Sequence, residues 1–136
     1  MSNLERTLSI IKPDAVERNL SENIKSIFSK NNLSVLDSKK LHISKDEAAE
    51  FYKVHQSKPF YDQLCSYLSS GPIEVMILEG KNAITKNREL MGATDPKNAK
   101  EGTIRKLYGI SIDKNSVHGS DSPDNAKAEI NFFFKK

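Results

Sequence analysis

The stretch GPIEVMILEG at residues 71–80 constrains the fold more than any other part of this chain. Its interior is nearly apolar throughout, and a glycine lies close to each end. Short apolar runs bounded by turn-forming residues are typical of strands in the middle of a sheet. The stretch therefore predicts a central strand, around which the remaining elements must be arranged.

The spacing of apolar residues predicts most of the other elements. Alternation of apolar and polar residues over 4–12 and 33–43 indicates two further strands. Leu20, Ile24 and Phe28 recur at helical spacing and indicate an amphipathic helix. More helices are expected at four places, which are after Ser44, after Pro59, over 82–92, and after Ser122.

Two serines mark the starts of helices. Ser44 is followed three residues later by Glu47, the pattern of a capping box. Ser122 precedes a proline at the first helical position, which favours the start of the closing helix. The stripes that should face the core are Ala48, Phe51, Tyr52 and His55 in the first helix, and Ala126, Ile130, Phe133 and Phe134 in the second.

Residues 93–113 break this regular pattern, with a single helical turn expected at TIRKLY. Long loops in compact domains usually serve a function. A short strand is expected at 115–118. The order of elements is then βαββαβ, the ferredoxin-like sandwich of the α+β class. It has a four-stranded antiparallel sheet with helices on one face, extra helices, and a long loop before the last strand.

Composition limits the classes of function. A length of 136 residues suits one domain over 1–136, and a net charge of +3 does not by itself imply a nucleic-acid partner. Cys65 is the only cysteine, which excludes an intrachain disulfide and a cysteine cage for a metal. The N-terminal apolar run is too short for a signal peptide or membrane span, so we expect a cytoplasmic protein without membrane contact.

One histidine lies in a turn-like stretch, KNSVHGSDSP, at residues 114–123. His118 is either an exposed turn residue or a nucleophile or general base held on a tight loop. Glu129 falls on the stripe that should face the core, where a carboxylate is costly unless it has a partner. It either reaches water at the edge of the stripe or binds one imidazole nitrogen of His118, which leaves the lone pair of the other nitrogen to attack.

Polar residues outside the apolar faces suit a polyphosphate. They comprise cations, a hydroxyl, an amide and the imidazole, namely Lys12, Arg88, Thr94, Arg105, Asn115 and His118. Arginine offers forked donors to phosphate oxygens, and lysine offers a point charge. No Walker loop or dinucleotide fingerprint is present, so side chains would have to hold the phosphates. The residues alone predict a phosphate-handling enzyme in which a histidine accepts a phosphoryl group and passes it on.

Four blocks of sequence carry a resemblance to a known family: ERTLSIIKPDAV, KPFYDQLCSYLSSGPIEVMILEG, GATDPKNAKEGTIR and NSVHGSDS. In this order and spacing they resemble nucleoside diphosphate kinases over essentially the whole chain. The resemblance implies a ping-pong exchange with broad base specificity. A nucleoside triphosphate gives its γ-phosphate to His118, and a nucleoside diphosphate then takes it.

The resemblance also implies roles for individual residues. Beside the nucleophile His118 it places Glu129, which orients the imidazole, and Ser120 and Tyr52, which neighbour it. The positions that match phosphate-binding residues are Lys12, Arg88, Thr94 and Arg105, and those that match sugar-binding residues are Lys12 and Asn115. The base would stack on Phe60, with Ile112 on its other side.

The resemblance further implies Mg²⁺ held mainly by phosphates and water rather than by protein ligands. Val54 stands where many members carry an acidic residue near the metal-bound water. The partners implied are nucleoside di- and triphosphates and further copies of this chain, in a tetramer or a hexamer built from dimers.

A second hypothesis is a catalytically idle paralogue that binds nucleotide or a protein partner. Such a module is expected to lose the nucleophile or a phosphate-binding cation. This chain keeps His118, Glu129, Lys12, Arg88 and Arg105, so we predict the enzyme.

Overall fold

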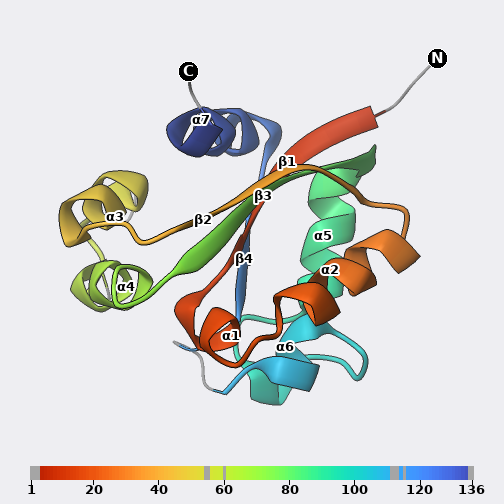
Figure 1. Ribbon diagram of the computed structural model, residues 1–136, viewed down its shortest axis with the longest axis horizontal. Helices are drawn as coiled ribbons and strands as arrows, with labels where there is room; N and C mark the ends of the chain where they lie inside the picture. Colours follow the sequence, from red (N-terminus) through yellow and green to blue (C-terminus); the bar gives the residue numbers. More distant parts are fainter. Residues whose placement is uncertain (1–3, 54–55, 60, 111–113, 115, 135–136) are drawn as a thin grey trace.

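The computed structural model describes residues 4–53, 56–59, 61–110, 114 and 116–134. Within them, four strands form one antiparallel sheet in the order β2-β3-β1-β4 (Figure 1). The strands are β1 (Leu4–Ile11), β2 (Ser34–Leu41), β3 (Ile73–Lys81) and β4 (Val117–Gly119). This confirms the α+β, ferredoxin-like sheet that the order of elements predicts.

The apolar stretch 71–80 supplies the central strand, as predicted. β3 pairs with β2 on one edge and with β1 on the other. Along β1 the pairing runs from Leu4 opposite Lys81 to Ile11 opposite Glu74. β1 in turn pairs with β4, so the short last strand lies at the edge of the described sheet.

Helices cover both faces of the sheet, and the prediction of helices on one face is therefore wrong. One buried cluster joins the sheet to α1 (Pro13–Glu17), α2 (Ser21–Lys30), α5 (Ala83–Met91) and α6 (Ile104–Tyr108). The other joins it to α3 (Lys45–Phe51), α4 (Tyr61–Leu68) and α7 (Pro123–Phe134). In Figure 1 these two groups of helices lie on opposite sides of the sheet.

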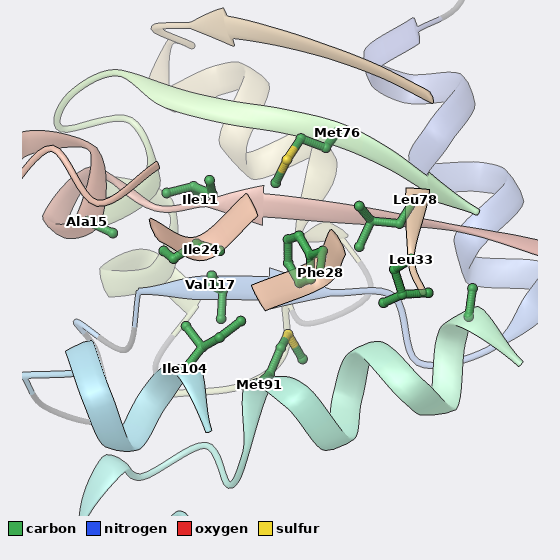
Figure 2. Close-up of a cluster of buried hydrophobic side chains, with 11 residues drawn as sticks. Ile11, Ala15, Ile24, Phe28, Leu33, Met76, Leu78, Met91, Ile104 and Val117 are labelled. Atoms are coloured by element: carbon green, nitrogen blue, oxygen red, sulfur yellow. The ribbon is translucent and has the colours of Figure 1, made fainter. Parts of the chain in front are cut away.

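The physical reason lies in the central strand. Met76 and Leu78 of β3 point into the first cluster, and Ile73 and Val75 point into the second. A strand that is apolar on both sides must be covered on both sides. Figure 2 shows the first cluster, in which Phe28 of α2 lies among side chains from the strands and Val117 of β4 points toward Ile104 of α6.

Local signals mark the starts of two of the helices. The Ser44 side chain accepts from the Glu47 backbone N–H and the Glu47 side chain accepts in return, so the predicted capping box is confirmed. Ser122 Oγ accepts from the Asn125 backbone N–H at the start of α7. Two short elements were not predicted, α1 and a 3-10 turn at Pro96–Asn98.

No helix in the described part of the chain has the length and apolar character that crossing a bilayer requires.

Candidate active site

His118 is the middle residue of β4, and the strand turns its side chain away from the neighbouring ones. Val117 lies in the cluster under α5 and α6, and a Cβ at Gly119 would contact Met91 of α5. Because side chains alternate along a strand, the imidazole faces the opposite side, where α3 and α7 lie. Its side chain is 23% exposed, so it is neither a freely solvated turn residue nor sealed in the core.

Glu129 of α7 holds one nitrogen of this imidazole. His118 Nε2 lies 3.0 Å from Glu129 Oε1, and the hydroxyl of Ser120 donates to the same oxygen at 2.9 Å. The carboxylate accepts both bonds, which places the proton of a neutral imidazole on Nε2 and leaves a lone pair on Nδ1. Of the two alternatives for Glu129, the structure shows the contact with His118.

Two aromatic residues at the end of α3 enclose the imidazole. Phe51 packs edge-on at a ring separation of 5.3 Å, and Tyr52 lies at 6.4 Å with its ring nearly perpendicular. Tyr52 is only 5% exposed. Burial first, and then the charge of Glu129, raise the pKa of Tyr52, so its phenol stays protonated. The sequence pattern predicts Phe51 only as a core residue, and its place on the inward stripe of this helix is the signal that points to it.

Arg105 is a buried cation close to the strand of His118. Its guanidinium donates to the carbonyl of Gly92 at 3.0 Å and to that of Val117 at 2.8 Å. Its Nε has no hydrogen-bond partner among the described residues. Burial first, and then the charge of Arg88, lower the pKa of Arg105 to about 10. A buried cation that is close to another cation is a favourable place for an anion.

Arg88 is exposed on α5 and supplies the second positive charge. Its charge also helps to lower the pKa of Asp121, after the larger effect of a hydrogen bond from Asn125. The start of α5 is fixed by Glu5 of β1, whose carboxylate accepts from the Ile84 backbone N–H at 2.9 Å. Arg88 therefore extends from a helix that is anchored to the sheet.

The structure also places two other residues that the sequence predicts at the site. Lys12 is buried at the end of β1, and its backbone N–H donates to the carbonyl of Ser116 at 2.8 Å, close to the start of β4. Thr94 is exposed, two residues beyond the end of α5 at Gly92. The interpretations of Phe60, Ile112, Asn115 and Val54 concern positions outside the described residues.

These groups together suit the transfer of a phosphoryl group. The imidazole of His118 is held in one tautomer, and cations from α5 and α6 lie near the strand that carries it. In the described ranges, no group of three or more histidine, cysteine, aspartate or glutamate residues is placed to hold a metal ion.

Comparison with known proteins gives a consistent result. A family model described as nucleoside diphosphate kinase matches residues 5–136. A nucleoside diphosphate kinase from a Nitratiruptor species is 57% identical over 131 residues, which cover 96% of each chain. One from Persephonella marina is 53% identical over 133 residues, which cover 98% of this chain and 95% of that one.

Solved structures agree with these sequence relatives. The nucleoside diphosphate kinase of Aquifex aeolicus has a TM-score of 0.94 at 38% identity and covers 97% of this chain, with 96% of its own chain matched. A nucleoside diphosphate kinase from Halobacterium salinarum, solved in complex with CDP, has a TM-score of 0.92 at 40% identity. That match covers 97% of this chain and 88% of the halophilic one.

Proposed function

Because this chain belongs to the nucleoside diphosphate kinase family, we propose that it carries out the family's phosphate transfer through a phosphohistidine at His118. The enzyme moves the γ-phosphate of a nucleoside triphosphate to a nucleoside diphosphate. The observation that carries the proposal is the bond between His118 Nε2 and Glu129 Oε1 at 3.0 Å, with Ser120 on the same oxygen. It leaves Nδ1 as the nitrogen that attacks.

In the first half-reaction, the lone pair of Nδ1 forms a bond to the γ-phosphorus. The bond from that phosphorus to the β-phosphate oxygen breaks, and its electron pair stays on the departing diphosphate. The imidazole then carries a positive charge, which the Glu129 carboxylate stabilises through the proton on Nε2. In the second half-reaction, a β-phosphate oxygen of the acceptor attacks the phosphorus, and the electron pair returns to Nδ1.

The cations of the site neutralise the charge that moves between these oxygens. The positive charge of Arg88 helps to lower the pKa of Arg105, so the two guanidinium groups repel each other. A polyphosphate between them would relieve this repulsion. Lys12 lies at the end of the strand that pairs with β4. We assign Arg88, Arg105 and Lys12 to the phosphates on these grounds, and Thr94 on the family resemblance alone.

Other assignments rest on the family alone. Enzymes that use nucleotides in this way generally require a divalent metal, and we propose Mg²⁺, which would neutralise and orient the phosphates when bound. Nucleotides are the partners, and a relative was solved with CDP. Two residue assignments stay predictions, namely stacking of the base on Phe60 and Ile112 and contact of Asn115 with the sugar. Three properties of the whole protein also stay predictions. They are one domain over 1–136, assembly into a tetramer or hexamer, and a cytoplasmic location.

The test is transfer of label from γ-labelled ATP with Mg²⁺ to the purified protein, followed by a chase with GDP. We expect an acid-labile label on the wild type that moves to GTP and that is missing from His118→Gln. A folded wild type that takes up no label would overturn the proposal and favour the idle paralogue. Label that persists on His118→Gln would place the nucleophile elsewhere.

A further inference from the structure

Ser116, two residues before His118, has a left-handed backbone with φ of +75°. The other described residues with positive φ that are not glycine are asparagines, at positions 19, 32 and 82. Asparagine visits this region readily, whereas serine does so at a cost in energy. Something must therefore hold Ser116 in this conformation, and such strain is often found next to functional groups.

The bonds that hold Ser116 come from the segment after β1. Its hydroxyl donates to Asp14 Oδ2 at 3.1 Å, and its carbonyl accepts from the Lys12 backbone N–H at 2.8 Å. The side chain of Arg18 reaches the same hydroxyl at 3.4 Å. Ser116 is completely buried, so water cannot substitute for these partners.

Asp14 is itself fixed by a network. Its carboxylate is 3% exposed, accepts from the hydroxyl of Tyr67, and pairs with Arg18 Nη2 at 3.2 Å. Its backbone N–H donates to the Tyr67 oxygen at 2.9 Å. Burial first, and then the bond to Asp14, raise the pKa of Tyr67, which keeps this phenol a donor. Arg18 also donates to the carbonyl of Tyr108, which ties the network to the end of α6.

The strand that carries His118 is short, and Ser116 lies directly before it. β4 contains three residues and pairs with β1 alone, at the edge of the described sheet. Its first residue, Val117, is buried, so a rotation of the backbone at Ser116 would be transmitted through Val117 to the imidazole. The network built on Asp14 is thus the fixed point from which the strand starts.

We propose that Asp14 and Ser116 are positioning residues, which set the direction of His118 Nδ1 by holding the backbone left-handed two residues before it. The inference rests on the proposed function of His118. Both residues act through the backbone that carries the imidazole and not through contact with the substrate. Their effect is on the rate of phosphoryl transfer to the imidazole and not on the affinity for nucleotide.

The first test compares Ser116→Ala with Ser116→Gly. Alanine loses the hydroxyl bond but keeps the unfavourable left-handed conformation, whereas glycine adopts that conformation freely. We expect Ser116→Ala to slow the labelling of His118 at saturating ATP by roughly 10-fold, since small misplacements of reacting groups are costly. Ser116→Gly should recover most of that loss, to within about threefold of wild type. The ATP concentration at half-maximal rate should stay unchanged in both.

Asn32→Ala is the matched control, because Asn32 is also left-handed, with φ of +65°, in the turn between α2 and β2. It should lower Tm as Ser116→Ala does but leave the labelling rate unchanged. Equal slowing in Asn32→Ala and Ser116→Ala would reduce the effect to general destabilisation and overturn the inference. A wild-type rate in Ser116→Ala, or no recovery in Ser116→Gly, would also overturn it.

Asp14→Asn tests the other end of the bond. It should slow labelling in the Ser116 protein but have little effect in the Ser116→Gly background, where the backbone no longer needs to be held. Equal slowing in both backgrounds would show that Asp14 does not act through Ser116. If Asp14→Asn does not fold, the comparison at Ser116 decides alone. Absence of label on the wild type would overturn the proposed function, whereas a labelled wild type with insensitive variants would overturn only this inference.

Discussion

At the scale of single residues, the contact of Glu129 with His118 does the most to define the chemistry. One carboxylate oxygen accepts from both the imidazole and the Ser120 hydroxyl. In the proposed mechanism, that arrangement fixes the tautomer and the orientation of the ring and stabilises the phosphorylated imidazole. The three effects should be lost together when the carboxylate is removed.

Glu129→Ala is therefore expected to slow the labelling of His118 by roughly 10- to 100-fold. Glu129→Gln should be less severe, because its amide oxygen can still accept from Nε2–H. Single-turnover transfer from γ-labelled ATP measures both rates. Glu17→Gln, which changes an exposed glutamate on α1, serves as the control and should match the wild type. Wild-type labelling by Glu129→Ala would show that the imidazole needs no orienting group.

Arg88 and Arg105 pose a different question at this scale, since two cations repel each other in the absence of an anion. Arg88→Gln removes the charge that helps to lower the pKa of Arg105. The free energy of unfolding without nucleotide should stay equal or rise by at most about 1 kcal/mol. The dissociation constant for ADP should rise by about 10-fold, since a charged hydrogen bond to phosphate is lost.

Urea unfolding and ADP titration of the same preparations measure these two effects. Lys86→Gln, which lies on the same helix, is the matched control and should leave ADP affinity unchanged. An ADP affinity of Arg88→Gln equal to that of the wild type would remove Arg88 from the phosphate site. A clear loss of stability without nucleotide would mean that Arg88 has a structural role.

At the scale of elements, the close contact between β4 and α5 determines where His118 lies. A Cβ added at Gly119 would overlap Asn87 Nδ2 and lie 3.0 Å from Met91 Sδ. Asn87 is fully buried, and neither atom of its amide has a hydrogen-bond partner among the described residues. The glycine next to His118 is therefore required by the neighbouring helix.

Gly119→Ala should destabilise the protein by about 1–3 kcal/mol, because the added methyl group overpacks this contact. Asn87→Ala removes the amide that the methyl group would overlap most closely and loses no described hydrogen bond. The double variant should recover at least half of the stability that Gly119→Ala loses. Urea unfolding of the three variants gives the coupling between the two positions, and purely additive losses would contradict the packing argument.

Elements with a local signal could be predicted from the sequence. The spacing of Ser44 and Glu47 predicts the capping box, and the glycine at position 92 predicts the end of α5. α1 could not be predicted in the same way, because Pro13 both ends the strand and begins the helix. Proline fits the first turn of a helix as well as the end of a strand. The residue type alone does not choose between these uses.

The candidate site was predictable where a residue broke a pattern. Glu129 was singled out because a carboxylate on an apolar stripe needs a partner, and His118 is that partner. The bonds from Arg105 to the carbonyls of Gly92 and Val117 could not be foreseen, since they depend on the folded path of the loop. Asp14 and Ser116 gave no signal, because polar residues beside a turn usually face water.

At the scale of the whole molecule, helices cover both faces of the sheet, whereas the sequence patterns predict helices on one face. Thr7 and Ser9 of β1 alternate with Leu8 and Ile10, which favours one polar face toward solvent. Both polar residues are nonetheless completely buried. They lie on the face that α5 covers. The alternation therefore predicts the strand correctly, but it wrongly predicts that the polar face is exposed to solvent.

Both faces should therefore contribute to stability. Phe28→Ala removes a buried ring from the cluster under α2, and Leu68→Ala removes a buried side chain from the cluster under α4. Each variant should reduce the free energy of unfolding by about 2–5 kcal/mol. Leu107→Ala, at a side chain that is 53% exposed, should change it by less than about 0.5 kcal/mol. A small effect at either buried position, measured by urea unfolding, would mean that its face is not sealed.

The edge position of β4 also has a consequence for synthesis on the ribosome. The other three strands of the sheet all precede residue 82, whereas His118 and Glu129 come from β4 and α7. Domains generally fold as units during synthesis. A nascent chain that ends before residue 117 therefore contains β1, β2 and β3 but neither His118 nor Glu129. The imidazole becomes oriented only when α7, which carries Glu129, has been made and has docked.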